Sequence, residues 1–165
     1  VDKAVRMIVP SGRGQVIFRL KDAELVSQLI DGNFPDYKAI IPKSAKTKTI
    51  ISTPAFLKAC KQAEVIAREG NNVVRLDIVP AEDGPGKVEI NATTEETGKS
   101  DISVEANIEG SGLLIAFNVH FLVQVLDVVH SPNVALETNA NTSPGVIRPM
   151  GDEDFTHVIM PMHLG

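Results

Sequence analysis

Hydrophobic positions from residue 112 to residue 161 follow the order strand, helix, strand, strand, strand. The dense apolar run at 113–117 predicts a buried strand, and Asn118 behind it suits a helix N-cap. The next apolar residues recur at helical spacing and predict one core-facing stripe: Phe121, Leu122, Val125, Leu126 and Val129. Polar residues occupy the other side: His120, Gln124 and Asp127. Pro132 stops the helix, and strand-like runs follow at 133–138, 144–149 and 155–161.

The same order of elements occurs once before in the chain. A β-branched run at 47–52 predicts a strand, and Thr53 is the expected cap of a helix with Pro54 at its first position. This helix is expected to run to about Glu69 and to end at Gly70-Asn71-Asn72. Strand-like runs follow at 73–79, 87–93 and 100–108. The repetition predicts one domain built from two similar halves, 47–108 and 112–161.

The beginning of the chain reads as the end of the same unit. Residues 5–9, 15–20 and 24–30 have the pattern of strands, without an opening strand and helix before them. We therefore expect the chain to start inside a preceding domain of a longer protein. Residues 31–42, which contain prolines and a glycine, are then the expected connector.

Composition is that of an ordinary globular chain, with 43% apolar and 22% charged residues. One cysteine excludes an internal disulfide, and Cys60 shares helical spacing with Phe56 and Ala63, which predicts a core position. No apolar run approaches the length of a membrane span and no signal peptide is present, so a cytoplasmic setting is expected.

The net charge of −5, from 16 basic and 21 acidic residues, argues against a DNA-binding domain that reads a groove. Even so, Lys58, Lys61 and Arg68 share one face of the first predicted helix. By itself this pattern is typical of a solvated surface.

Motifs for catalysis are absent from the sequence. The four histidines lack zinc-ligand spacing, and neither a GxSxG motif nor a phosphate-binding loop occurs. We expect no catalytic residue, no metal site and no cofactor. The C-terminal stretch FTHVIMPMHL (155–164) is apolar almost to its end, although chain ends are usually polar unless they are docked. Its methionines suit either a binding groove or core packing, and the pattern leaves both open.

Four motifs together resemble the bacterial DNA polymerase III beta subunit, the replicative sliding clamp family. They are LIDGNFPDYKAIIP (29–42), FNVHFLVQVL (117–126), SPGVIRP (143–149) and VIMPMHL (158–164). The resemblance implies an α+β DNA-clamp fold, in which a duplicated βαβββ unit puts helices on one face and antiparallel sheets on the other. It also implies that residues 1–34 end the middle domain, 35–46 connect, and 47–165 form the C-terminal domain.

The function implied by the resemblance is that of a processivity factor without catalytic activity. Two subunits of this family close into a homodimeric ring that encircles duplex DNA without regard to sequence. The ring tethers the polymerase III catalytic subunit, the clamp loader and other proteins through their short linear motifs. Lys58, Lys61 and Arg68 would face DNA phosphates. Val65 and Ile66 would contact the other subunit, with core packing as the alternative interpretation.

The family also implies a peptide-binding pocket. The matching residues here are Pro35, Ile40, Asn118, Phe121, Gly145, Met160, Pro161, Met162, His163 and Leu164. Three positions depart from the family pattern: Ala39 and His163 stand where arginine is common, and Asn71 where an aromatic can stand. These departures put the polar rim of the pocket in question.

Two other functions remain open at this stage. The first is a non-enzymatic peptide-binding scaffold that does not act on DNA. It is favoured by the second helix, whose exposed side offers only His120 as a possible cation. The second is an enzyme whose site lies outside this chain, for which the sequence offers no support.

Overall fold

The computed structural model describes residues 4–12, 14–94 and 98–163, and the chain divides into two compact units, 1–36 and 37–165. In the first unit, β1 (Arg6–Ile8), β2 (Gln15–Arg19) and β3 (Glu24–Gln28) form an antiparallel sheet in that order. These are the three predicted strands, each shorter than its apolar run. Every residue of β3 is exposed.

The second unit contains the predicted repeat. After the short helix α1 (Tyr37–Ile40), the first half consists of β4 (Thr47–Ser52), α2 (Thr53–Ala67), β5 (Val73–Val79), β6 (Gly86–Thr94) and β7 (Gly98–Gly110). The second half consists of β8 (Leu113–Asn118), α3 (Val119–Val128), β9 (Asn133–Thr138), β10 (Gly145–Pro149) and β11 (His157–Ile159). Each half has the order βαβββ, so the predicted duplication and α+β class are confirmed.

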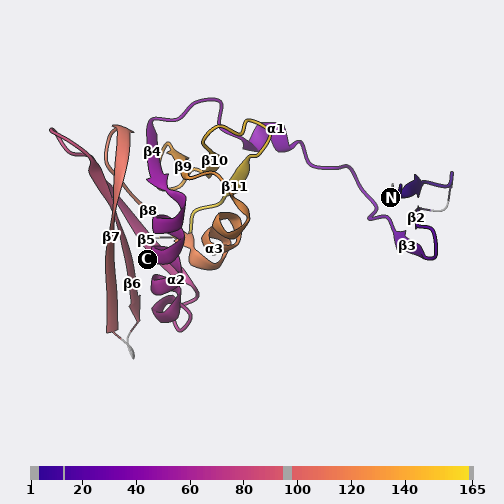
Figure 1. The fold of residues 1–165 in the computed structure, drawn as a ribbon, viewed down its shortest axis with the longest axis horizontal. Helices are drawn as coiled ribbons and strands as arrows, with labels where there is room; N and C mark the ends of the chain where they lie inside the picture. The colour runs from indigo at the N-terminus through magenta and orange to yellow at the C-terminus, as the bar shows by residue number, and fades with distance from the viewer. Residues whose placement is uncertain (1–3, 13, 95–97, 164–165) are drawn as a thin grey trace. The chain divides into compact units, whose positions relative to one another are not determined.

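One antiparallel sheet joins the two halves, with the strand order β11-β10-β9-β4-β7-β6-β5-β8. The opening strands link the two halves. β4 pairs with β7 of its own half and with β9 of the second, and β8 pairs with β5 of the first half. The helices α2 and α3 lie side by side, and α2 packs against β6 and β7 (Figure 1). These pairings join both halves in one sheet, over which they share a single core.

That core is built from the inward faces of the strands and one face of each helix. Its largest fully buried side chains include Phe56 of α2, Phe117 of β8 and Leu122 of α3. Cys60 is fully buried, as its spacing predicted. Burial of apolar surface of this kind is the main favourable term in folding.

Three details differ from the prediction. The N-cap of α2 is Ser52 and not Thr53, it makes no side-chain capping bond, and the Thr53 hydroxyl is buried with no partner among the described residues. The helix ends at Ala67 instead of about Glu69. The expected connector contains the helical turn α1.

The predicted apolar stripe of α3 is wrong at one position, because 51% of Phe121 is exposed. On an ideal helix Phe121 lies at the edge of the arc centred on Leu122 and Leu126. Val119 and Val123 fill the buried face instead.

Candidate binding surfaces: a C-terminal groove and the faces of two helices

The C-terminal segment is docked and not frayed. After β11 the backbone N–H of Met162 donates to the carbonyl oxygen of Ala116 over 2.8 Å, and the two residues form an isolated antiparallel bridge. Ala116 belongs to β8, the strand at the far edge of the sheet from β11. The chain end therefore crosses the open edge of β8, and this bond fixes the position of the methionines.

A groove of about 380 Å³ lies along this segment. It is lined by Asn141, Thr142, Met160, Pro161, Met162 and His163. Four of the predicted peptide-binding residues thus come together on one surface. Met160 is exposed, whereas Pro161 and Met162 are half-buried, so the groove has an apolar floor with a mobile thioether at its rim.

Asn141 and Thr142, in the loop between β9 and β10, form the remaining lining of this groove. Sequence reasoning missed both, because polar residues in a turn carry no periodicity that marks them as part of a site. Their side chains can donate and accept hydrogen bonds, and so the groove combines apolar contacts with polar ones.

The other predicted peptide-binding residues do not line this groove. Asn118 caps α3, where its side-chain oxygen accepts from the His120 amide over 3.0 Å, as predicted. Phe121 and Ile40 are exposed in the second unit, while Pro35 belongs to the first unit. Leu164 lies outside the described residues.

Gly145 is buried, which speaks against direct contact with a ligand. A Cβ at this position would stand 2.7 Å from Cζ of Phe117 and 3.4 Å from Cγ2 of Ile159. The glycine therefore permits close packing between β10 and the core, which is a sufficient physical reason for it at this position.

The predicted DNA-facing cations lie on the exposed face of α2, but two of the three have acidic partners. Lys61 Nζ is 2.8 Å from Oδ1 of Asp127 on α3, and Arg68 Nη2 is 3.8 Å from Oε2 of Glu64. The same glutamate lies 3.2 Å from Nδ1 of His120, whose Nε2 is 3.0 Å from Gln124. Lys58 is exposed and makes no ion pair with any described residue.

Val65 and Ile66, the predicted subunit contacts, point to different sides of α2. Val65 is 67% exposed and lies three, four and seven residues from the three cations, hence on their face. Ile66 is partly buried and packs against the core. Core packing, the alternative interpretation, therefore holds in part for Ile66 and not for Val65.

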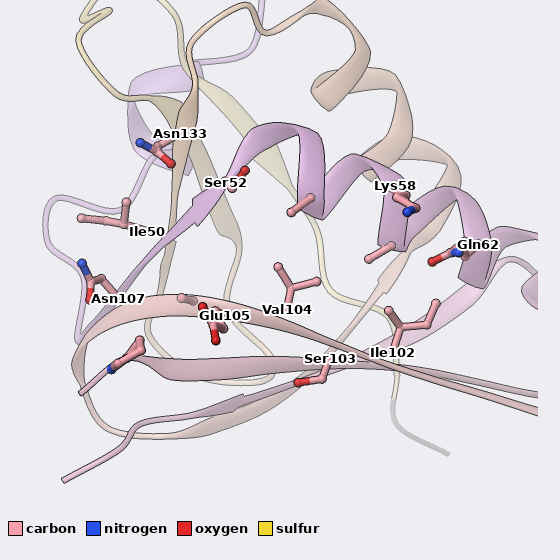
Figure 2. Close-up of a pocket in the computed structure, with 14 residues that line it drawn as sticks. Ile50, Ser52, Lys58, Gln62, Ile102, Ser103, Val104, Glu105, Asn107 and Asn133 are labelled. Atoms are coloured by element: carbon pink, nitrogen blue, oxygen red, sulfur yellow. The ribbon is translucent and has the colours of Figure 1, made fainter. Parts of the chain in front are cut away.

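A second groove, of about 660 Å³, separates α2 from β7. Its lining includes Lys58 and Gln62 of α2, with Ile102 and Val104 of β7 along the other side (Figure 2). It exists because β4 pairs with β7 only along Ala106–Gly110 and then turns into α2. The β4-side edge of residues 98–105 is left without a strand partner among the described residues.

Cys60 is a titratable group inside the core. Burial, with a smaller contribution from the nearby Glu64 carboxylate, raises the pKa of the Cys60 thiol far above its ordinary range, so this thiol stays protonated and unreactive. In the described part of the chain no group of three or more His, Cys, Asp or Glu side chains could hold a metal ion. No helix there is long and apolar enough to cross a membrane.

Comparison with known proteins identifies the family. Residues 38–163 match the model of the DNA polymerase III beta subunit, C-terminal domain. The chain is 36% identical over 150 residues to a beta sliding clamp of Bacillus subtilis (strain 168), and 30% over 152 residues to one of Synechococcus elongatus. These alignments cover 90% and 92% of this chain but only 39% and 40% of the relatives.

Solved structures agree. The DNA polymerase III beta subunit of Thermotoga maritima superposes with a TM-score of 0.82 at 30% identity, over 98% of this chain and 41% of that one. A DNA polymerase sliding clamp from Bacillus subtilis gives 0.84 at 34% identity, over 96% and 41%. The fold is thus that of a clamp domain. The chain belongs to the DNA polymerase III beta subunit family.

Proposed function

We propose that this chain supplies the C-terminal domain of a ring-shaped sliding clamp that encircles duplex DNA and tethers a DNA polymerase during replication. The observation that carries the proposal is the family match over residues 38–163. Residues 1–34 would be the end of the middle clamp domain, and 35–46 the connector. The chain spans about two fifths of its curated relatives, so the rest of the ring comes from outside it.

Duplex DNA would pass along the exposed faces of α2 and α3. Lys58, Lys61 and Arg68 lie there, which supports weak attraction to phosphates. Each phosphate contact contributes about 0.9 to the salt slope, which is the fall in log K with log salt concentration. Three cations per domain make few such contacts, so they cannot hold DNA tightly. Enclosure by a ring supplies the retention that these contacts lack.

Closure of the ring would use the groove between α2 and β7. An unpaired strand edge is a template for pairing with another chain. An edge strand of a second subunit could extend the sheet at residues 98–105, while α2 supplies side-chain contacts beside it (Figure 2). Ile66 lies on this side of α2, four residues after Gln62, so it would flank the contact.

The C-terminal groove would take short linear peptides from the catalytic subunit of the polymerase, the clamp loader and other partners. Met160 and Met162 offer deformable apolar contacts, and Asn141 and Thr142 offer polar ones. His163 in place of arginine would remove a permanent positive charge from the rim. The proposed role is one of binding, in the cytoplasm, without catalysis or cofactor.

Primer extension tests the proposal. The intact protein, loaded by its clamp loader onto primed circular template, should lengthen the products that the polymerase makes in one binding event. Equal product lengths with and without the protein would refute a processivity role. They would favour the scaffold that does not act on DNA. The ion pairs of Lys61 and Arg68 are compatible with that function, because both cations already have an acidic partner.

Peptide binding is tested separately by titration with a short peptide that carries glutamine followed by leucine and phenylalanine. Met160→Ala should weaken binding by roughly tenfold, the effect of about 1.4 kcal/mol. Met150→Ala is the matched control, because Met150 is also exposed but lies outside the groove. Equal affinity of both variants and the parent would remove the groove from the site.

A further inference from the structure

We propose that Asp127 and Glu64 act as exchange partners for Lys61 and Arg68, so that each of these two cations alternates between a carboxylate and a DNA phosphate. The two acids would thereby keep the contact with DNA weak and brief, as sliding requires. This inference rests on the proposed function, because it assumes that the faces of α2 and α3 meet duplex DNA.

The ion pair between Lys61 and Asp127 can open easily. Lys61 Nζ and Asp127 Oδ1 are 2.8 Å apart, and the two side chains are 50% and 47% exposed. Ion pairs at such exposed sites contribute little net stability, because water screens them and both side chains lose freedom. An approaching phosphate can therefore take the lysine at small cost, and the aspartate can recover it when the phosphate moves on.

The second acid is held more firmly than its cation. The Glu64 side chain is only 13% exposed, whereas Arg68, its partner at 3.8 Å, is 71% exposed. His120 of α3 approaches the same carboxylate at 3.2 Å. The carboxylate thus lies half enclosed between the helices, and the arginine is the exposed member of the pair. An acid in this position attracts the arginine back from any contact that it makes with an outside phosphate.

The balance of charge on this face supports the same conclusion. Lys58, Lys61 and Arg68 are opposed by Glu64 and Asp127, and of these cations only Lys58 lacks an acidic partner among the described residues. A surface selected for tight DNA binding would not place two carboxylates among three cations, because fixed negative charge repels phosphate. The arrangement instead gives nearly balanced, sequence-independent attraction.

The test is a double-mutant cycle on the affinity of the intact protein for a linear duplex, measured by fluorescence anisotropy over a series of salt concentrations. Asp127→Asn frees Lys61, so it should tighten binding and steepen the salt slope by up to about 0.9, the value of one phosphate contact. Lys61→Gln alone should weaken binding and lower the salt slope, because it removes a cation that contacts phosphate. In the double variant the gain from Asp127→Asn should disappear, because the released cation is gone.

Two results would overturn the inference. An unchanged salt slope in both Asp127→Asn and Glu64→Gln would show that the acids do not restrain the cations. A gain that persists in the Lys61→Gln background, or that Asp101→Asn matches, would show a general effect of net charge. Asp101 is the matched control, since it is an exposed carboxylate of β7. Ile102 and Val104 face α2, so the side chain of Asp101 points to the opposite face of the sheet. Absence of any attraction in the parent protein would instead count against the proposed function.

Discussion

At the scale of the residue, His157 is a histidine of β11 that folding makes harder to protonate. Its partial burial lowers its pKa from the ordinary value of 6.5, and no carboxylate among the described residues pairs with it to offset this effect. The native state therefore binds a proton at this site more weakly than the unfolded chain does.

A dependence of stability on pH follows. The contribution of neutral His157 is fully present above about pH 6.5, decreases as the pH falls below that value, and is lost once the pH is below the native pKa. His157→Gln should remove this component, so the parent should lose more stability than the variant on acidification. Denaturant unfolding of both proteins across this pH range measures the difference. Parallel curves would contradict the lowered pKa.

Asn71 and Asn72 show how local geometry decides what sequence reasoning leaves open. Both adopt the left-handed conformation, with φ of 61° and 59°, which asparagine tolerates better than other residues with a side chain. The Asn72 N–H donates to Ala67 over 2.8 Å, and its carbonyl oxygen accepts from Val119 over 2.8 Å. The sequence predicted a helix end in this region but put it at about Glu69 and not at Ala67, and it did not predict the link to the start of α3. The left-handed turn gives a local reason for asparagine at position 71.

At the scale of the element, two neighbouring residues of α3 differ in burial, because one packs in the core and the other lies at the surface. Leu122 is fully buried, and Phe121 beside it is half exposed. Helical periodicity alone grouped both in one stripe, because a stripe of apolar residues does not show where the buried arc ends. The exposed aromatic ring of Phe121 is available for contact with a binding partner and contributes little to the core.

The two residues should respond differently to truncation. Leu122→Ala should cost about 2–5 kcal/mol in the free energy of unfolding, because it leaves a cavity. Phe121→Ala should cost less than about 1 kcal/mol, in line with an exposed position, and should weaken peptide binding. Denaturant unfolding and peptide titration measure both. Equal losses of stability would show that Phe121 belongs to the core.

Much of the element order could be predicted from the sequence, because apolar periodicity and turn residues act locally. The βαβββ repeat and the burial of Cys60 followed from those patterns. The pairing of β4 with β9 and of β8 with β5 across the two halves could not be predicted, since it depends on contacts between strands that lie far apart in the sequence. The place of Asn141 and Thr142 in the lining of the C-terminal groove could not be predicted either. It depends on the position of the β9–β10 loop beside the end of the chain.

At the scale of the whole molecule, the proposed ring would need a surface on this domain that a second subunit can bury. Val65 is the exposed candidate, since Ile66 already packs in part against its own core. The position of Val65 on the face that carries Lys61 and Arg68 means that this side chain stands where the subunit contact and the DNA-facing surface would meet.

Val65→Asp should convert dimers of the intact protein to monomers, because an unpaired charge is costly to bury in an interface. A rise in the dissociation constant of at least roughly tenfold is expected, which corresponds to 1.4 kcal/mol. Light scattering over a dilution series measures it. Val128→Asp is the matched control, being similarly exposed at 59% on α3. Dimers that survive Val65→Asp would remove Val65 from the interface, and dimers that also survive Gln62→Arg would contradict closure through the groove beside β7.

In the proposed clamp, enclosure of the DNA by the ring, and not direct contact, retains the protein. The most direct measurement loads the intact protein onto nicked circular duplex, isolates the complex by gel filtration, and then cuts the circle once with a restriction enzyme. A closed ring should stay on the circle and leave soon after the cut, because only enclosure retains it. Protein that remains bound to the linear product would show that direct contacts hold it, and would contradict the sliding clamp.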